Sequence, residues 1–193
     1  DELPAAPIPD GLTATLRPYQ ELGFRWLHFL HTARLGGILA DDMGLGKTVQ
    51  ALALACSLKE SGELERPLLV VAPTSVLGTW AEQSARFAPG LSVRVVTQTS
   101  RKRNQQLAEL IEGADIVVTS YTLVRLDEDE YVEQPWSVVL LDEAQFVKNR
   151  HARGHQPAQQ EHHHDDGDGQ GDGLAPQQVC FGRLGEGLAH EHV

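Results

Sequence analysis

The sequence has 193 residues, of which 41% are hydrophobic and 22% are charged, values ordinary for a soluble globular protein. This length suits a single α/β domain with a sizeable core. No apolar run approaches the roughly 18 residues of a membrane span, and the N-terminus is acidic, unlike a signal peptide. We therefore expect a cytoplasmic protein without a membrane partner. The net charge of −11 argues against a nucleic-acid coat protein.

In chain order, residues 1–14 contain Pro4, Pro7 and Pro9 and are predicted to be a linker. A helix is predicted to begin at residues 16–20, where Pro18 suits the first turn, and to end by residues 36–37. Its predicted apolar face consists of Leu22, Trp26, Phe29 and Leu30.

Apolar runs then alternate with helix-forming runs. The predicted strands are residues 37–40, 67–72, 91–96, 115–119 and 136–141, and the predicted helices are 49–58, 75–87, 102–111 and 121–126. The acidic run 127–130 is interpreted as a solvated loop. Such alternation predicts an α/β fold with a mostly parallel β-sheet and helices on both faces. Ligands of such sheets bind beyond the carboxyl ends of the strands.

A glycine-rich turn lies between the first predicted strand and the next helix, at residues 41–48. Glycines such as Gly44 and Gly46 let backbone N–H groups converge on an anion, and the helix N-terminus adds its dipole. Lys47 would then reach the β- and γ-phosphates, and Thr48 would ligate Mg²⁺. Asp41 stands where the full phosphate-loop (Walker A) motif has its first Gly, so an ordinary glycine turn with a solvated Lys is the alternative.

The last predicted strand is followed directly by Asp142 and Glu143. A carboxylate at the end of a neighbouring strand can hold Mg²⁺, and the next carboxylate can polarise the water that attacks the γ-phosphate. Alone, the pair is equally consistent with a surface acidic pair. Together with Gly46-Lys47-Thr48 upstream, it predicts an ATP or GTP site.

These motifs resemble those of the SWI/SNF-related ATPases, the double-stranded-DNA translocases of helicase superfamily two. Residues 42–48 and 142–145 (DEAQ) resemble motifs I and II, and residues 16–20 resemble the Q motif. The remaining similarities are residues 71–77 with Trp80 and 86–89 (motif Ia and its helix), 118–121 (motif Ib) and 145–149. The resemblance covers residues 15–149 and implies the first of two RecA-like lobes.

The resemblance also implies roles for individual residues. Glu143 would be the catalytic base, and Gln20 would recognise adenine. Mg-ATP would be bound by Gly44, Leu45, Gly46, Lys47, Thr48 and Asp142, with Thr48 and Asp142 on the metal and Lys47 also acting in catalysis.

Contacts to the phosphate backbone of double-stranded DNA are implied for Thr74, Ser75, Thr119 and Ser120, since hydroxyl and N–H groups position nucleic acid. Helix capping is the alternative role of these four residues. The basic cluster 101–103 would either meet DNA or be a solvated helix start.

Residues 150–193 break this order. They hold few aliphatic residues, and they are interpreted as a low-complexity tail, disordered or aberrant, which a frameshift, a wrong splice or a truncation would explain. His162, His163, His164, Asp165 and Asp166 would be the ligands of a metal-binding alternative. The family's motif III and its second lobe with the arginine fingers are not found, so we expect the chain to bind Mg-ATP but to hydrolyse it feebly.

The expected function is therefore the ATP-binding lobe of a DNA-dependent ATPase, located with DNA in the nucleoid or the nucleus. An RNA helicase of the same superfamily and a non-catalytic nucleotide-binding or interaction module are the two alternatives from the sequence.

Overall fold

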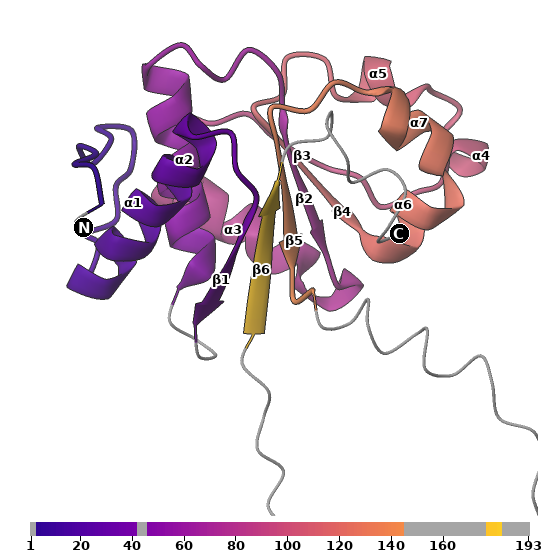
Figure 1. Ribbon diagram of the computed structural model, residues 1–193. Coiled ribbons are helices and arrows are strands. Elements are labelled where there is room, and N and C mark those ends of the chain that lie inside the picture. Colours follow the sequence, from indigo (N-terminus) through magenta and orange to yellow (C-terminus); the bar gives the residue numbers. More distant parts are fainter. Residues whose placement is uncertain (1–2, 42–45, 145–176, 183–193) are drawn as a thin grey trace, which may run out of the picture.

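The computed structural model describes residues 3–41, 46–144 and 177–182 (Figure 1). Its helices are α1 (Pro18–Thr32), α2 (Lys47–Glu60), α3 (Leu77–Phe87), α4 (Ser100–Arg103), α5 (Leu107–Leu110), α6 (Tyr121–Leu126) and α7 (Glu128–Glu133), with the 3₁₀ turn η1 (Thr74–Val76) before α3. Its strands are β1 (Gly37–Asp41), β2 (Leu68–Ala72), β3 (Val93–Val95), β4 (Ile116–Ser120), β5 (Val138–Asp142) and β6 (Gln177–Gly182).

The strands form one sheet in the order β1-β6-β5-β2-β4-β3. Strand β2 is central and pairs in parallel with β4 and β5, so that Val70 lies beside both Val118 and Leu140. Strand β3 extends the parallel part beyond β4. The mostly parallel α/β sheet predicted from the alternating pattern is therefore confirmed.

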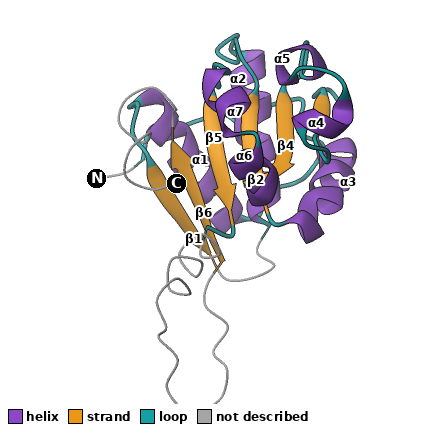
Figure 2. Ribbon diagram, turned by 90° about the vertical axis from the view of Figure 1, so that its right-hand side faces the viewer, coloured by secondary structure: helices purple, strands orange, loops and turns teal. Residues whose placement is uncertain are grey.

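Helices cover both faces of the sheet, with α6 and α7 on one side and α1 and α2 on the other (Figure 2). Alternate residues of β2 enter two separate cores because successive side chains of a strand point to opposite faces. Leu68 and Val70 pack with buried residues of α1, α2 and α3. Leu69 and Val71 pack with residues of α5 and α7 and of the segment before β5. Strand β2 is buried along its whole length, as its continuous apolar run predicts.

Helix α1 starts where predicted, and its buried face matches the predicted one only in part. Gln20 Oε1 accepts a hydrogen bond of 2.9 Å from the backbone N–H of Arg17, which lies just outside the helix. The buried apolar side chains are Phe24, Leu27 and Leu30, while Leu22 is 59% exposed. Of the predicted face, Leu30 is buried and Trp26 packs against the core, whereas the prediction for Leu22 was wrong. The run carries apolar residues on several sides, and the position of α2 decides which side is covered.

The region from 100 to 133 also differs from the prediction. The helix expected over 102–111 is divided into α4 and α5, with Asn104 in the left-handed region at φ 50° between them. The acidic run 127–130 is not a solvated loop: it begins α7, and the Asp127 and Glu130 carboxylates pair with the Arg103 guanidinium. The side chains of Arg103 and Asp127 are both 5% exposed, so Arg103 is part of the interior rather than of a solvated basic cluster.

The N-terminal stretch predicted as a linker has no helix or strand between residues 3 and 14, yet it packs on the lobe. Ala6 and Leu12 are buried, and the Gly11 N–H donates to the Glu60 carboxylate over 2.6 Å. The backbone of Thr13 donates to the Phe87 carbonyl over 2.8 Å. These contacts fasten the stretch to α2 and α3.

One strand comes from the region interpreted as a low-complexity tail. Strand β6 lies between β1 and β5 and runs antiparallel to both, with Cys180 opposite Ile38 and Leu141. The rest of that region, including the His162–Asp166 candidate metal site, lies outside the described residues. Among the residues that are described, no helix has the length and apolar character needed to cross a membrane.

Candidate nucleotide site

The candidate site lies where β1 leads to α2 and where β5 ends, at the carboxyl edge of the parallel strands (Figure 1). Gly46 caps α2 in the left-handed conformation, with φ 78°, which favours glycine. The first helical residues, Lys47 and Thr48, follow it directly. Gly44 and Leu45, predicted to shape the same loop, lie outside the described residues.

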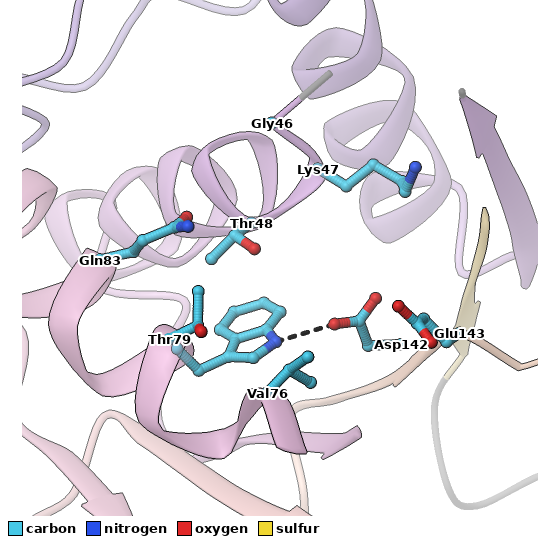
Figure 3. Close-up of a pocket in the computed structure, with 9 residues that line it drawn as sticks. Gly46, Lys47, Thr48, Val76, Thr79, Gln83, Asp142 and Glu143 are labelled. Carbon is cyan, nitrogen blue, oxygen red and sulfur yellow. Dashed lines mark hydrogen bonds between the residues drawn. The ribbon is translucent and has the colours of Figure 1, made fainter. Parts of the chain in front are cut away.

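A pocket of about 210 Å³ opens at this edge. Figure 3 shows Lys47, Asp142 and Glu143 gathered on one side of it, with Thr48 nearby. The structure thus brings the pair Lys47 and Thr48 beside the distant pair Asp142 and Glu143, and all four residues were predicted as site residues. The remaining lining residues are Gly46, Val76, Thr79, Trp80 and Gln83.

The last four of these, from η1 and α3, were not predicted as site residues. Residues 76, 79, 80 and 83 follow the i, i+3, i+4, i+7 spacing of one helical face. That spacing was the available signal, but Val76 and Trp80 were named from the sequence only as part of the resemblance to motif Ia and its helix. A pattern of this kind shows that residues share a face, not whether the face meets a sheet or a pocket.

The two carboxyl groups are partly withdrawn from water. Burial is the main cause that raises the pKa of Asp142 above its ordinary value, while the hydrogen bond from Trp80 and the charge of Lys47 act in the opposite direction. Burial and the neighbouring Asp142 carboxylate raise the pKa of Glu143. A raised pKa makes Glu143 a stronger base than a solvated glutamate.

The donor set fits a magnesium ion with phosphates. Lys47, only 7% exposed, is the ammonium group whose charge acts on both carboxylates. One ammonium beside two partly desolvated carboxylates leaves an excess of negative charge, which a divalent cation would offset. Carboxylate and hydroxyl oxygens, as on Asp142 and Thr48, are the ligand type that Mg²⁺ prefers.

Asp142 is held at its side chain, by Trp80 and by the Glu143 backbone, and at its main-chain carbonyl by Tyr121. The Trp80 indole Nε1–H donates to its Oδ2 over 2.9 Å (Figure 3), and the Tyr121 hydroxyl donates to its backbone carbonyl over 2.8 Å. The next residue, Glu143, has φ 53°, in the left-handed region that non-glycine residues rarely adopt. Backbone conformations of this kind cost about 1–3 kcal/mol and concentrate at functional sites.

Gln20, predicted to recognise adenine, lies beside Gly46, the residue that caps α2. A Cβ atom placed on Gly46 would come within 2.4 Å of Gln20 Nε2. The Oε1 atom of Gln20 accepts the hydrogen bond from Arg17 that starts α1. Gln20 does not line the pocket itself, so it would contact a part of the nucleotide outside it.

The four residues predicted to touch DNA divide into two pairs. Thr74 and Ser75 lie in η1, directly after β2, and both are exposed. Thr119 is fully buried, with its hydroxyl 2.9 Å from the Tyr131 hydroxyl, and Ser120 is 3% exposed and caps α6 through the Leu123 N–H. The capping alternative therefore describes Ser120, and the Thr119 and Ser120 hydroxyls both make their contacts inside the lobe.

A mostly parallel sheet, a glycine-capped helix after β1 and a carboxylate pair after β5 define a lobe of the RecA-like class. Residues 19–164 match the SNF2-related domain family. The chain belongs to this family and is the N-terminal lobe of the SWI/SNF type within helicase superfamily two.

Individual relatives support this assignment. The Bacillus subtilis protein YwqA is 44% identical over 153 residues, which cover 79% of this chain and 17% of YwqA. Helicase SWR1 of Eremothecium gossypii is 39% identical over 74% of this chain and 10% of its own length. The TATA-binding protein-associated factor mot1 of Schizosaccharomyces pombe is 37% identical over 76% of this chain and 8% of its own length.

Two solved structures agree in fold. The Sulfolobus solfataricus SWI2/SNF2 ATPase core in complex with dsDNA has a TM-score of 0.64 and 39% identity over 78% of this chain and 30% of that one. The ATPase core domain alone has a TM-score of 0.57 and 40% identity, over 66% and 25%. The chain therefore spans less than a third of the length of each of these five chains.

Proposed function

We propose that this chain is the Mg-ATP-binding lobe of a double-stranded-DNA-dependent ATPase that uses ATP hydrolysis to move along DNA. The observation that carries the proposal is the convergence of Lys47, Thr48, Asp142 and Glu143 on one pocket at the carboxyl edge of the sheet. A pocket of about 210 Å³ is smaller than the roughly 300–1,000 Å³ of whole-ligand sites, so it suits the phosphate end of a nucleotide.

Each residue has a distinct proposed role in this site. The Lys47 ammonium binds the β- and γ-phosphates, and the backbone of residues 44–46 with the start of α2 donates hydrogen bonds to them. Thr48 and Asp142 hold Mg²⁺, which neutralises charge on the phosphates. Glu143 accepts a proton from the water that attacks the γ-phosphate, and Gln20 recognises the adenine edge.

We propose that DNA lies along the carboxyl edge near Thr74 and Ser75, whose exposure leaves both hydroxyls accessible. The resemblance to a SWI2/SNF2 core solved with dsDNA supports this partner.

A second RecA-like lobe, with its arginine fingers, would complete the motor, and such a finger contributes about 10³–10⁵-fold to the rate where it operates. The chain by itself is then a nucleotide-binding lobe with feeble turnover. Its location would be the nucleus or the nucleoid-containing cytoplasm.

Calorimetric titration of the 193-residue chain with Mg-ATP tests the proposal. Lys47→Ala should weaken binding by about tenfold or more, because it removes a charge-assisted contact to the phosphates. Lys102→Ala removes an exposed lysine of α4 and should leave the affinity unchanged. Equal affinities of wild type and Lys47→Ala would refute the assigned site.

For the proposed motor, ATP turnover stimulated by single-stranded RNA rather than by duplex DNA would favour the RNA-helicase alternative.

A further inference from the structure

Trp80 has an unusual partner for a buried indole. The residue is 2% exposed and belongs to the first turns of α3, where its ring packs in the core formed with α1 and α2. An indole N–H needs an acceptor when it is buried. Trp80 takes one oxygen of the Asp142 carboxylate, 62 residues away, at the wall of the candidate nucleotide pocket (Figure 3).

A second buried tryptophan, Trp136, shows how a buried indole N–H is ordinarily satisfied. Trp136 is 5% exposed, and its Nε1–H donates over 2.8 Å to the backbone carbonyl of Tyr131, inside the other core. A carbonyl satisfies an indole N–H without bringing a charge into the interior. A neutral carbonyl would therefore have been enough to satisfy the Trp80 N–H. The effect of the contact with a carboxylate falls on the orientation of Asp142.

The hydrogen bond from Trp80 fixes the orientation of the Asp142 carboxylate. An indole has one N–H and no acceptor, so Trp80 engages a single oxygen, Oδ2. The backbone of Glu143 also hydrogen-bonds this carboxylate. The Tyr121 hydroxyl holds the backbone carbonyl of the same residue. Trp80 belongs to the core on one face of the sheet and Tyr121 packs against the core on the other, so both layers of helices fix the end of β5.

We propose that Trp80 is a positioning residue for the magnesium ligand Asp142: its indole N–H holds Oδ2 so that the other oxygen is presented to Mg²⁺, directly or through a bound water. This inference rests on the proposed nucleotide site. Partners that orient a ligand in this way typically contribute about 10–100-fold to metal affinity. Preorganisation matters here because Mg²⁺ accepts little deviation from octahedral geometry.

The test is the Mg²⁺ dependence of ADP affinity, measured by calorimetry with Mg²⁺ and with EDTA. Trp80→Phe keeps an aromatic ring in the core but removes the N–H. It should reduce the gain in affinity that Mg²⁺ provides by about tenfold or more, with little change in EDTA. Trp136→Phe makes the same chemical change away from the pocket, and should leave both affinities as in the wild type.

The outcomes separate the two proposals. If wild type gains affinity with Mg²⁺ and a folded Trp80→Phe gains the same, the positioning role is wrong and the nucleotide site stands. Equal losses with and without Mg²⁺ would also contradict it, because they indicate general damage to the pocket. If wild type binds no ADP under either condition, the proposed function fails, and the role of Trp80 fails with it.

A second measurement needs no variant. The chain has three tryptophans and thus three indole N–H signals in a ¹H–¹⁵N spectrum. The Trp80 signal should shift when Mg-ADP is added and much less with ADP in EDTA, whereas the Trp136 signal should stay in place. A Trp80 indole signal with the same shift in Mg-ADP as in ADP with EDTA would overturn the inference, even if Trp80→Phe does not fold.

Discussion

The backbone of Gly46 approaches the side-chain amide of Gln20 so closely that a Cβ atom on Gly46 would lie 2.4 Å from Nε2. This contact joins the start of α1 to the start of α2, and thus the residue proposed to recognise adenine to the residues proposed to bind the phosphates. The left-handed backbone with φ 78° favours glycine at this position, and an added Cβ atom would also displace the Gln20 amide.

Gly46→Ala should therefore reduce Mg-ATP affinity and destabilise the fold by about 1–3 kcal/mol. Gly62 provides a matched control, because it has the same φ of 78° and a Cβ atom added to it would meet no other atom within 4 Å. Gly62→Ala should carry the backbone cost alone, about 1 kcal/mol, and leave nucleotide binding intact. Urea denaturation and calorimetry measure both effects, and identical behaviour of the two variants would exclude a role for the Gln20 contact.

The ionised Asp142 carboxyl group should lower the free energy of unfolding of the nucleotide-free lobe at neutral pH. Its pKa is raised in the folded chain, mainly by burial, so the folded state binds this proton more tightly than the unfolded state. Stability contributed by this group therefore falls as pH rises from the ordinary pKa of 3.8 through the raised pKa, and the full cost is present above it.

Asp142→Asn should accordingly raise the free energy of unfolding at neutral pH while it abolishes the Mg²⁺-dependent part of nucleotide binding. Its amide oxygen can still accept the Trp80 hydrogen bond. The difference from wild type should shrink on acidification through this window. Denaturation curves at several pH values test the prediction, and a variant less stable than wild type at neutral pH would contradict it.

The Arg103 side chain should matter for stability rather than for DNA binding. Arg103→Ala leaves Asp127, 5% exposed, without its ion-pair partner, and breaking a buried pair costs about 3 kcal/mol. The exposed neighbour Lys102 is the control, since surface substitutions usually change stability by less than about 0.5 kcal/mol. Similar unfolding free energies for Arg103→Ala and Lys102→Ala would show that the network contributes little.

Cys56 should be unreactive in the folded chain. Burial is the main cause that raises the pKa of its thiol to about 11, so only roughly one molecule in a thousand carries the thiolate at pH 8. Alkylation with iodoacetamide followed by peptide mass spectrometry should find Cys56 unmodified in the native chain and modified in concentrated urea. Rapid native modification of Cys56 would show that α2 is not packed as described.

The sheet was predictable because its strands are short apolar runs buried on both faces, as in β2. The buried ion pairs of Arg103 could not be predicted, because Arg103 contacts Asp127 and Glu130 only once α4 and α7 are packed together. Similarly, the buried face of α1 depends on α2: a Cβ on Gly23 would lie 1.9 Å from Gln50 Oε1, so the two helices approach closely at this point. No periodicity in either helix specifies that approach.

The site was predicted to a different degree for different residues. Motif spacing predicted Lys47, Thr48, Asp142 and Glu143, because each proposed role demands its residue type, and the structure places all four around one pocket. Motif resemblance also suggested Thr119 as a DNA contact, but its hydroxyl is used inside the fold with Tyr131. The contact from Trp80 to Asp142 could not be foreseen, because an aromatic residue on a helical face is equally suited to packing alone.

The most direct test of the nucleotide site is paramagnetic broadening with Mn²⁺ in place of Mg²⁺, in the presence of ADP. We expect selective broadening of the Thr48 and Asp142 backbone signals and of the Trp80 indole signal, with the Trp136 indole signal spared. Broadening centred on residues 162–166, with the signals of Thr48 and Asp142 unaffected, would contradict the assigned site and would support metal binding by the histidine-rich segment instead.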